Sequence, residues 1–192
     1  MTRRGDWMQT FTGRQFWPLD PHPEEVCIED IAHSLALQCR FAGHCRVPYS
    51  VAEHSVRVAM LLRQWRPKDR VLTLMGLFHD GSEAYLVDVP RPSKPFLIGY
   101  AEMEALVQTA IWHRFGLVAG EWTGRAACVQ PDTAALIKRA DNVLLATEAR
   151  DLMSAPPVPW AGLPEPLPRL IHPWPWTFAE KRFLEVFAEV AT

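Results

Sequence analysis

Residues 69–84 read DRVLTLMGLFHDGSEA. Leu72, His79 and Glu83 fall on one face at helical spacing, and Asp80 lies one step round from that face. The spacing predicts a helix over 69–84 whose apolar side carries a histidine. A polar group on an apolar stripe costs free energy unless it is satisfied, so His79 is expected to meet a partner inside the protein.

Helical spacing of apolar residues continues on both sides of this segment. It predicts helices over 24–39, 51–65, 100–115, 132–153 and 177–190. Ser50 and Glu53 stand three apart at the start of the second of these, as a capping box requires. The sequence therefore predicts an all-α fold.

The segment 154–176 holds eight of the 17 prolines, which forbid a helix or a central strand there. Because it is also rich in Trp and Leu, we expect it to lie across the helical body rather than to act as a flexible linker. Residues 1–23 end in a proline-rich run, and this pattern predicts that they form an extended arm over the surface. The expected organisation is one domain, in which this arm precedes a helical core over 24–153. Residues 154–192, with the last helix, pack on the same core.

Length, composition and charge argue against several classes of protein. A chain of 192 residues with 48% hydrophobic content fits one domain, and a net charge of −2 with scattered Lys and Arg argues against binding long nucleic acid. The four cysteines form no CxxC pair, and no apolar stretch is long enough to span a bilayer. We expect a cytoplasmic protein without a membrane anchor, and a homo-oligomer in which the Trp-rich tail contributes to packing or assembly.

Four residues of metal-ligand type fall on the inward faces of three predicted helices. They are His54, His79, Asp80 and Asp141. Several polar intrusions into apolar faces suggest that these side chains meet. Two imidazoles and two carboxylates form a mixed N/O set that suits one divalent transition metal ion, Zn, Co, Mn, Ni or Fe. In octahedral geometry two positions remain for water and a substrate oxygen, as metal-assisted hydrolysis of a phosphate ester requires.

Three segments carry a resemblance to a known family. EHS at 53–55, LFHDGSEAYLVDVPRPSK at 77–94 and IKRADN at 137–142 resemble the motif regions of the HD-domain phosphohydrolases. Within that superfamily the chain is similar to small bacterial and phage 5′-deoxynucleotidases and deoxyadenosine triphosphate hydrolases. The resemblance covers residues 25–153 and implies a helical HD-domain bundle with one catalytic metal on the four ligands named above.

The resemblance also implies two catalytic carboxylates. Glu83 matches a glutamate beside the reacting water, and Asp88 matches a second carboxylate next to the scissile group. The spacing agrees for Glu83, which follows His79 by one helical turn and can orient or deprotonate a water. Larger relatives that hold two metals carry further histidines, whereas this chain offers only His113 between Asp80 and Asp141, so one ion is expected.

Substrate contacts follow from charge and from the same resemblance. Arg40 suits bidentate phosphate binding, and Phe41 beside it can stack on a base or ribose. Lys138 lies one turn before Asp141, and Lys94 closes the proline-rich segment, so both can reach phosphate oxygens.

The expected activity is metal-dependent phosphohydrolysis of a (deoxy)nucleotide by metal-activated water. It would release triphosphate from a dNTP or phosphate from a dNMP. One alternative is a non-catalytic, metal-containing nucleotide-binding regulatory protein, and another is a helical interaction module without metal.

Overall fold

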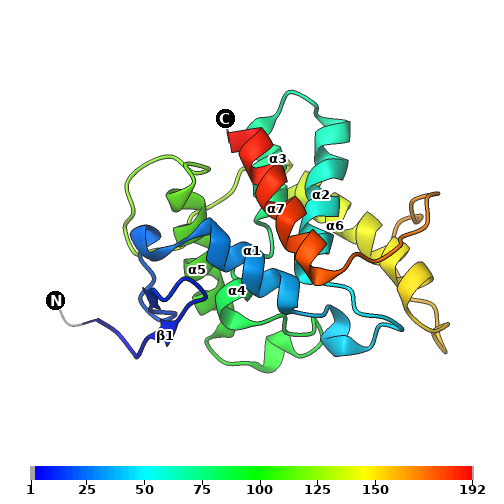
Figure 1. Ribbon diagram of the computed structural model, residues 1–192, viewed down its shortest axis with the longest axis horizontal. Helices are drawn as coiled ribbons and strands as arrows, with labels where there is room; N and C mark the ends of the chain where they lie inside the picture. Colours follow the sequence, from blue (N-terminus) through cyan, green and yellow to red (C-terminus); the bar gives the residue numbers. More distant parts are fainter. Residues whose placement is uncertain (1–2, 192) are drawn as a thin grey trace.

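The structure, a computed structural model, describes residues 3–191. Within this range the fold is predominantly helical, as predicted, and forms a single domain (Figure 1). The α-helices are α1 (Ile28–Leu37), α2 (Val51–Trp65), α3 (Arg70–Leu77), α4 (Glu83–Leu86), α5 (Tyr100–Arg114), α6 (Pro131–Leu152) and α7 (Trp176–Ala191). The remaining elements of the described chain are three 3-10 turns and two antiparallel strands. The turns are η1 (Pro23–Glu25), η2 (Phe41–Gly43) and η3 (Lys94–Phe96), and the strands are β1 (Met8–Gln9) and β2 (Gln15–Phe16).

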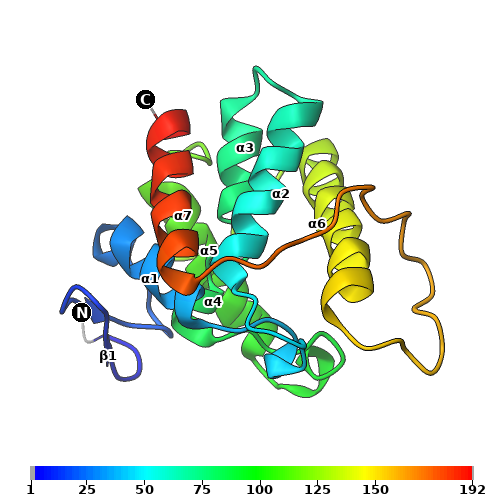
Figure 2. The same ribbon diagram turned by 45° about the vertical axis from the view of Figure 1, so that its right-hand side comes forward.

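Helix α2 is the central element, and α1, α3, α6 and α7 pack around it (Figure 2). One side of α2 joins the main core through Val51, Val56 and Ala59, and another joins α6 through Val58 and Leu62. These faces bury side chains on nearly the whole circumference of α2. A polar residue on this helix is therefore enclosed by neighbouring helices.

Helices α2 and α3 approach closely at Gly76. A Cβ atom at that position would lie 2.3 Å from Cδ1 of the fully buried Leu62. A larger residue here would require the Leu62 side chain to move, whereas the backbone of α2 lies at an ordinary contact distance, 3.5 Å to Cα of Ala59. This close approach lies three residues before His79, which follows α3.

Four of the predicted helices are confirmed to within one residue at each end: α2, α5, α6 and α7. The start of α2 follows the predicted cap, because the Ser50 side chain accepts from the backbone N–H of Glu53.

The helix predicted over 69–84 is wrong in its second half. Helix α3 ends at Leu77, and a turn separates it from α4. Gln108 of α5 explains the break, because its side chain accepts from the backbone N–H of Ser82 at 3.0 Å and donates to the carbonyl of Phe78 at 2.7 Å. A tertiary contact thus replaces the helical hydrogen bonds, and His79 and Asp80 lie in the turn.

The helix predicted from residue 24 begins later. Residues Pro23–Glu25 form η1, and the fully buried Val26 is extended, so α1 starts at Ile28. The predicted surface arm is corrected over residues 3–23, and residues 1–2 lie outside the described range. This segment forms the hairpin of β1 and β2 and inserts Phe16 into the core, where its ring stacks on Tyr85 at a centroid distance of 3.8 Å.

The later part of the proline-rich segment crosses the helical body, as predicted, whereas its first part loops out beside the end of α6 (Figure 2), and we call residues 154–175 the strap. Side chains of α6 and α2 fasten its backbone. Thr147 accepts from the N–H of Leu167 at 2.9 Å, and Glu53 accepts from the N–H of Trp174 at 2.7 Å. These bonds satisfy strap donors that have no helix or sheet to join.

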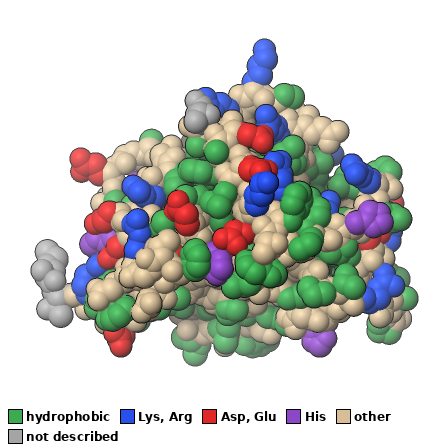
Figure 3. All heavy atoms as spheres, in the orientation of Figure 1, with side chains coloured by type: hydrophobic (Ala, Val, Ile, Leu, Met, Phe, Trp, Pro, Cys, Tyr) green, Lys and Arg blue, Asp and Glu red, His purple; other side chains and the backbone are tan. Residues whose placement is uncertain are grey.

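The outer surface mixes side-chain types. On the face in Figure 3, acidic, basic and apolar side chains lie next to one another. Among the described residues, every helix is too short or too polar to cross a lipid bilayer.

Candidate metal centre

His54 lies on α2 with none of its surface exposed. Its Nδ1 atom is 2.6 Å from Oε1 of Glu148, a fully buried carboxylate of α6. Because a carboxylate accepts, Nδ1 carries a proton, and the Nε2 atom points to a different partner. Glu148 therefore sets both the orientation of the His54 ring and the nitrogen that is presented to the site.

His79 presents the same nitrogen. Its Nδ1 atom lies 2.8 Å from the carbonyl oxygen of Gly76, which can only accept, so Nδ1 donates here as well. The Nε2 atoms of His54 and His79 face each other at 3.2 Å. Two lone pairs at this distance require a positive charge, either a proton or a metal ion.

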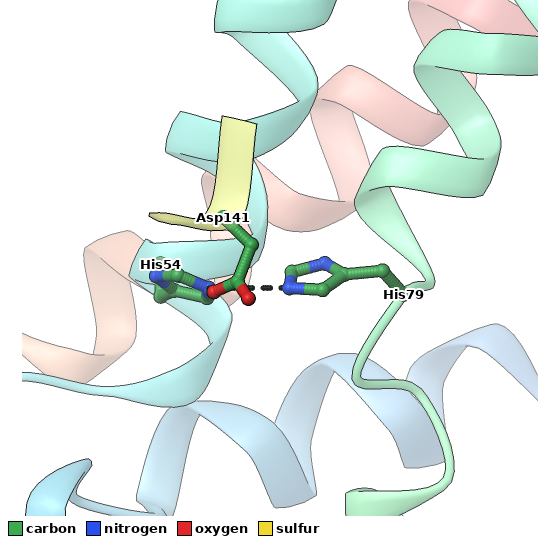
Figure 4. Close-up of side chains that lie close together, drawn as sticks. All are labelled: His54, His79 and Asp141. Atoms are coloured by element: carbon green, nitrogen blue, oxygen red, sulfur yellow. Dashed lines mark hydrogen bonds and ion pairs between the residues drawn. The ribbon is translucent and has the colours of Figure 1, made fainter. Parts of the chain in front are cut away.

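Two carboxylates lie beside these nitrogens. Oδ1 of Asp141, from α6, is 3.5 Å from Nε2 of His54, and Figure 4 shows the carboxylate beside the contact between the two rings. Oδ2 of Asp80 is 3.1 Å from Nε2 of His79 and 3.7 Å from Nε2 of His54. Ligand atoms of His54, His79 and Asp141 lie within 4.8 Å of one another, so these three residues can hold a metal ion. Asp80 lies next to this group, and its part as a fourth ligand stays a prediction.

The carboxylates make the site attractive to positive charge. Burial and Arg40 lower the pKa of His54, but Glu148 and Asp141 outweigh them and raise it to about 9. Burial raises the pKa of Asp141, yet hydrogen bonding and charge from His54 and His79 hold it well below its usual range. A metal ion that binds here therefore meets a charged carboxylate and displaces a proton from His54.

The site opens onto a pocket of about 750 Å³, a volume typical of small-molecule sites. Its walls contain Asp80 and Asp141. They also contain every residue predicted to take part in catalysis or substrate binding, namely Arg40, Phe41, Glu83, Asp88, Lys94 and Lys138. The structure thus brings these side chains together, and their individual roles stay predictions.

Glu83 and Asp88 add two carboxyl groups to the pocket wall. Glu83 is 5% exposed, and its Oε2 atom is buried without a hydrogen-bond partner among the described residues. Burial, followed by the charges of Asp80 and Asp88, raises the pKa of Glu83 well above its usual range. Burial also raises the pKa of Asp88. Carboxyl groups with raised pKa values are suited to hold or transfer a proton.

The backbone before Asp88 is strained. Val87 has φ 67° and ψ 152°, a region that β-branched residues rarely occupy. Its carbonyl accepts from the Tyr100 hydroxyl at 3.1 Å, and the N–H of Asp88 donates to Oε1 of Gln38 at 3.0 Å. These two bonds hold the strained segment and fix where Asp88 enters the pocket.

The basic side chains predicted to bind phosphate differ in their burial and in the carboxylates that they already contact. Arg40 is buried between carboxylates, with Nε 3.2 Å from Oε2 of Glu148 and Nη1 3.4 Å from Oδ2 of Asp80. The first contact is close enough for an ion pair but is not aligned as a hydrogen bond. Lys138, which is half exposed, lies 2.7 Å from Oδ2 of Asp141. Arg40 is therefore mainly a fixed part of the site.

Lys94 and Arg91 enter the pocket from the segment before α5. The ammonium group of Lys94 lies 2.6 Å from Glu104 and 3.6 Å from Oε1 of Glu83. Arg91 lies 3.3 Å from Oδ2 of Asp141 with 61% of its side chain exposed. Both are within reach of a ligand in the pocket, and Arg91 was not anticipated from the sequence.

Glu148 and Trp160 were also missed by sequence reasoning. Glu148 follows Asp141 by seven residues, two turns along α6, and that spacing could have placed both on one face. Trp160 lines the pocket from the strap, and the sequence pattern held no signal for that position.

Comparison with known proteins gives relatives but no described activity. No family model matches the sequence. The chain is 36% identical over 146 residues to uncharacterized protein YfdR of Escherichia coli (strain K12). The aligned region covers 76% of this chain and 72% of YfdR. It is 35% identical over 150 residues to an uncharacterized protein of Rhodobacter capsulatus, and this alignment covers 76% of this chain and 72% of that protein. The chain belongs to the same family as YfdR.

Proposed function

We propose that this protein is an HD-type, metal-dependent phosphohydrolase that acts on (deoxy)nucleotides. The observation that carries the proposal is the pair of Nε2 atoms of His54 and His79, which face each other at 3.2 Å while both Nδ1 atoms donate elsewhere. The carboxylates of Asp80 and Asp141 lie beside them. This donor set fits a divalent transition metal ion.

The metal would be held by His54, His79, Asp80 and Asp141. A bound divalent ion supplies Lewis acidity, which polarises a phosphoryl oxygen and makes water a better nucleophile. The motif segments that resemble HD-domain phosphohydrolases contain all four residues, and this likeness supports both the ligand set and the reaction class.

Glu83 is suited to handle the proton of the attacking water. Its Oε2 atom is buried, lacks a hydrogen-bond partner among the described residues, and belongs to a side chain that lines the pocket. An acceptor at this place can orient a water and take its proton. Asp88, on the same wall, is suited to protonate or orient the leaving oxygen.

Phosphate binding would fall to the cations of the pocket wall. Lys94, Lys138 and Arg91 carry side chains that can turn from their present carboxylate partners to phosphate oxygens. Arg40 adds a fixed positive charge beside Asp80. These charges would stabilise the transition state of phosphoryl transfer.

The test begins with metal. Purified protein is reconstituted with Mn, Co, Ni, Zn or Fe and assayed by elemental analysis, together with the variants His54→Asn and His33→Asn. His33 is a suitable control because it also pairs with a carboxylate, Glu180 at 3.3 Å, outside the site. We expect metal to be lost in His54→Asn and kept in His33→Asn. Equal metal in both variants would contradict the ligand assignment.

Activity is then measured on ribo- and deoxyribonucleoside mono- and triphosphates, scored for release of phosphate, pyrophosphate and triphosphate. The Glu83→Gln variant keeps the shape of the side chain and removes its basicity. General base catalysis typically contributes a factor of about 10²–10⁴, so we expect kcat to fall by that order with metal retained. Tight nucleotide binding without hydrolysis under any metal would favour the regulatory alternative.

A further inference from the structure

Two aromatic rings lie together at the pocket. Phe41 follows Arg40 in η2, whereas Trp160 belongs to the strap, and their ring centroids are 6.3 Å apart with planes tilted by 48°. Both rings line the same pocket as Asp80 and Asp141. Trp160 keeps 43% of its surface exposed, so its contact with Phe41 leaves much of the indole uncovered.

The backbone at Phe41 is held in an unfavourable conformation. Phe41 has φ 56° and Ala42 has φ 50°, both in the left-handed region that residues with a Cβ atom avoid. The Arg40 guanidinium lies over the Phe41 ring, 5.4 Å from its centroid. Strain of this kind persists where the surroundings fix it, and it is common where a ligand is held.

Trp160 reaches the pocket from the strap, and residues on both sides of it contact the pocket or α6. Met153, which directly follows α6, lines the pocket before Trp160, and Leu163 lines it after Trp160. The strap is then tied to α6 where Leu167 donates to Thr147. The pocket wall therefore contains the two rings and these aliphatic side chains as well as charged groups.

We infer that Phe41 and Trp160 are the two sides of a nucleobase subsite, an inference that rests on the proposed nucleotide substrate. A base between two rings requires about 7 Å, two contact distances of about 3.5 Å. The two rings now contact each other directly at 6.3 Å and 48°, so a base would enter by displacing the exposed Trp160 ring away from Phe41 and turning it toward a parallel plane.

The subsite selects for the presence of a base and tolerates its identity. Stacking uses the faces of the rings, which every base possesses, whereas discrimination between bases needs hydrogen bonds to their edges. A pocket that stacks a base near a phosphate-binding wall favours nucleotides over sugar phosphates of the same charge.

The experiment compares Trp160→Ala and Trp160→Phe with wild type and with Trp7→Ala. Trp7 is also 43% exposed and does not line the pocket, so it controls for the loss of a surface indole. The readout is the ratio of kcat/KM for each of four deoxyribonucleoside 5′-monophosphates to kcat/KM for deoxyribose 5-phosphate. We expect Trp160→Ala to lower this ratio by about 5- to 150-fold for all four bases. Trp160→Phe should retain most of the ratio, and Trp7→Ala should retain all of it.

Binding separates this inference from the proposed function. Dissociation constants for the same nucleotides are measured by calorimetry with Glu83→Gln protein, with and without Trp160→Ala. If wild type binds nucleotides without hydrolysing them and Trp160→Ala weakens binding, the subsite is supported and the hydrolase proposal fails. If nucleotides are hydrolysed but Trp160→Ala changes neither the ratio nor the dissociation constants, the subsite is refuted and the hydrolase proposal stands. Absence of any nucleotide binding would refute both.

Discussion

Glu148→Gln provides a sharp test of how the metal site is built. Oε1 of Glu148 accepts from Nδ1 of His54 at 2.6 Å and from the Tyr49 hydroxyl at 2.9 Å, and Oε2 lies 3.2 Å from Nε of Arg40. Burial raises the pKa of Glu148, but Arg40 and His54 lower it to about 2, so the group is charged at neutral pH. Glutamine keeps the size of the side chain and removes this charge.

The expected magnitude follows from what the charge does. A carboxylate behind a ligating histidine fixes its ring and increases its basicity, and loss of such a partner typically costs 10–100-fold in metal affinity, about 1.4–2.7 kcal/mol. Removing one partner of a buried ion pair costs about 3–5 kcal/mol of stability. The cost here should be smaller, because Asp80 still lies 3.4 Å from the Arg40 guanidinium.

Metal affinity is measured by titrating Co²⁺ or Zn²⁺ in competition with a chromophoric chelator, and folding is monitored by thermal unfolding. Glu53→Gln is the matched control. Glu53 is equally buried and also belongs to an ionic contact, but it binds Arg57 and the strap rather than His54. We expect Glu53→Gln to lose stability and keep metal affinity. If Glu148→Gln binds metal as tightly as wild type, or if Glu53→Gln loses as much affinity, the orienting role of Glu148 is refuted.

Three further predictions concern the elements around the site. Gly76→Ala should cost about 1–3 kcal/mol and weaken metal binding, because the new methyl group would meet Cδ1 of the fully buried Leu62 and force the contact between α2 and α3 to repack. Adding Leu62→Ala should restore metal affinity but not stability, and failure of that rescue would contradict the steric explanation. Val87→Gly should stabilise the protein by about 0.5–2 kcal/mol in urea unfolding, because glycine tolerates φ 67°, whereas Val87→Ala should give no such gain. In metal-free protein the pKa of His54 is raised from 6.5 to about 9, so its charged form stabilises the fold below about pH 6.5 and this stabilisation is lost as the pH rises through about 9. The melting temperature of metal-free protein should fall across that window, and the metal-loaded protein should not show this fall.

The sequence predicted elements whose signals are local. Helix α2 has a capping serine and an apolar stripe, and both its ends agree with the prediction. The helix predicted over 69–84 failed because its break depends on Gln108, 28 residues after Asp80 and on another helix. Periodicity cannot anticipate a side chain that takes over the hydrogen bonds of a distant turn.

The residues of the candidate site also differ in whether the sequence alone can predict them. His54, His79 and Asp141 could be selected because each is a polar residue on a predicted inward face, and burial requires a partner. Glu148 looks like an ordinary acid in a helix with charged neighbours, and it becomes part of the site only when α6 packs on α2. Trp160 lies in an irregular segment with no period, so only the folded chain shows that it reaches the pocket.

The ionisation of the site gives an independent argument for a cation. Carboxylates raise the pKa of His54, and after burial the neighbouring carboxylates raise the pKa of Glu83 and contribute to the raised pKa of Asp88. Burial is the first cause of the shifts of Glu83 and Asp88, and the negative charge of Asp80 adds to both, whereas Glu148 and Asp141 cause the shift of His54. One divalent ion beside the Nε2 atoms of His54 and His79 would oppose all three shifts, because it would favour neutral His54 and charged Glu83 and Asp88. Neutral His54 is the state that metal ligation requires, and charged Glu83 is the state that can accept a proton from water, so the ion that completes the ligand set would also prepare Glu83 for its proposed role.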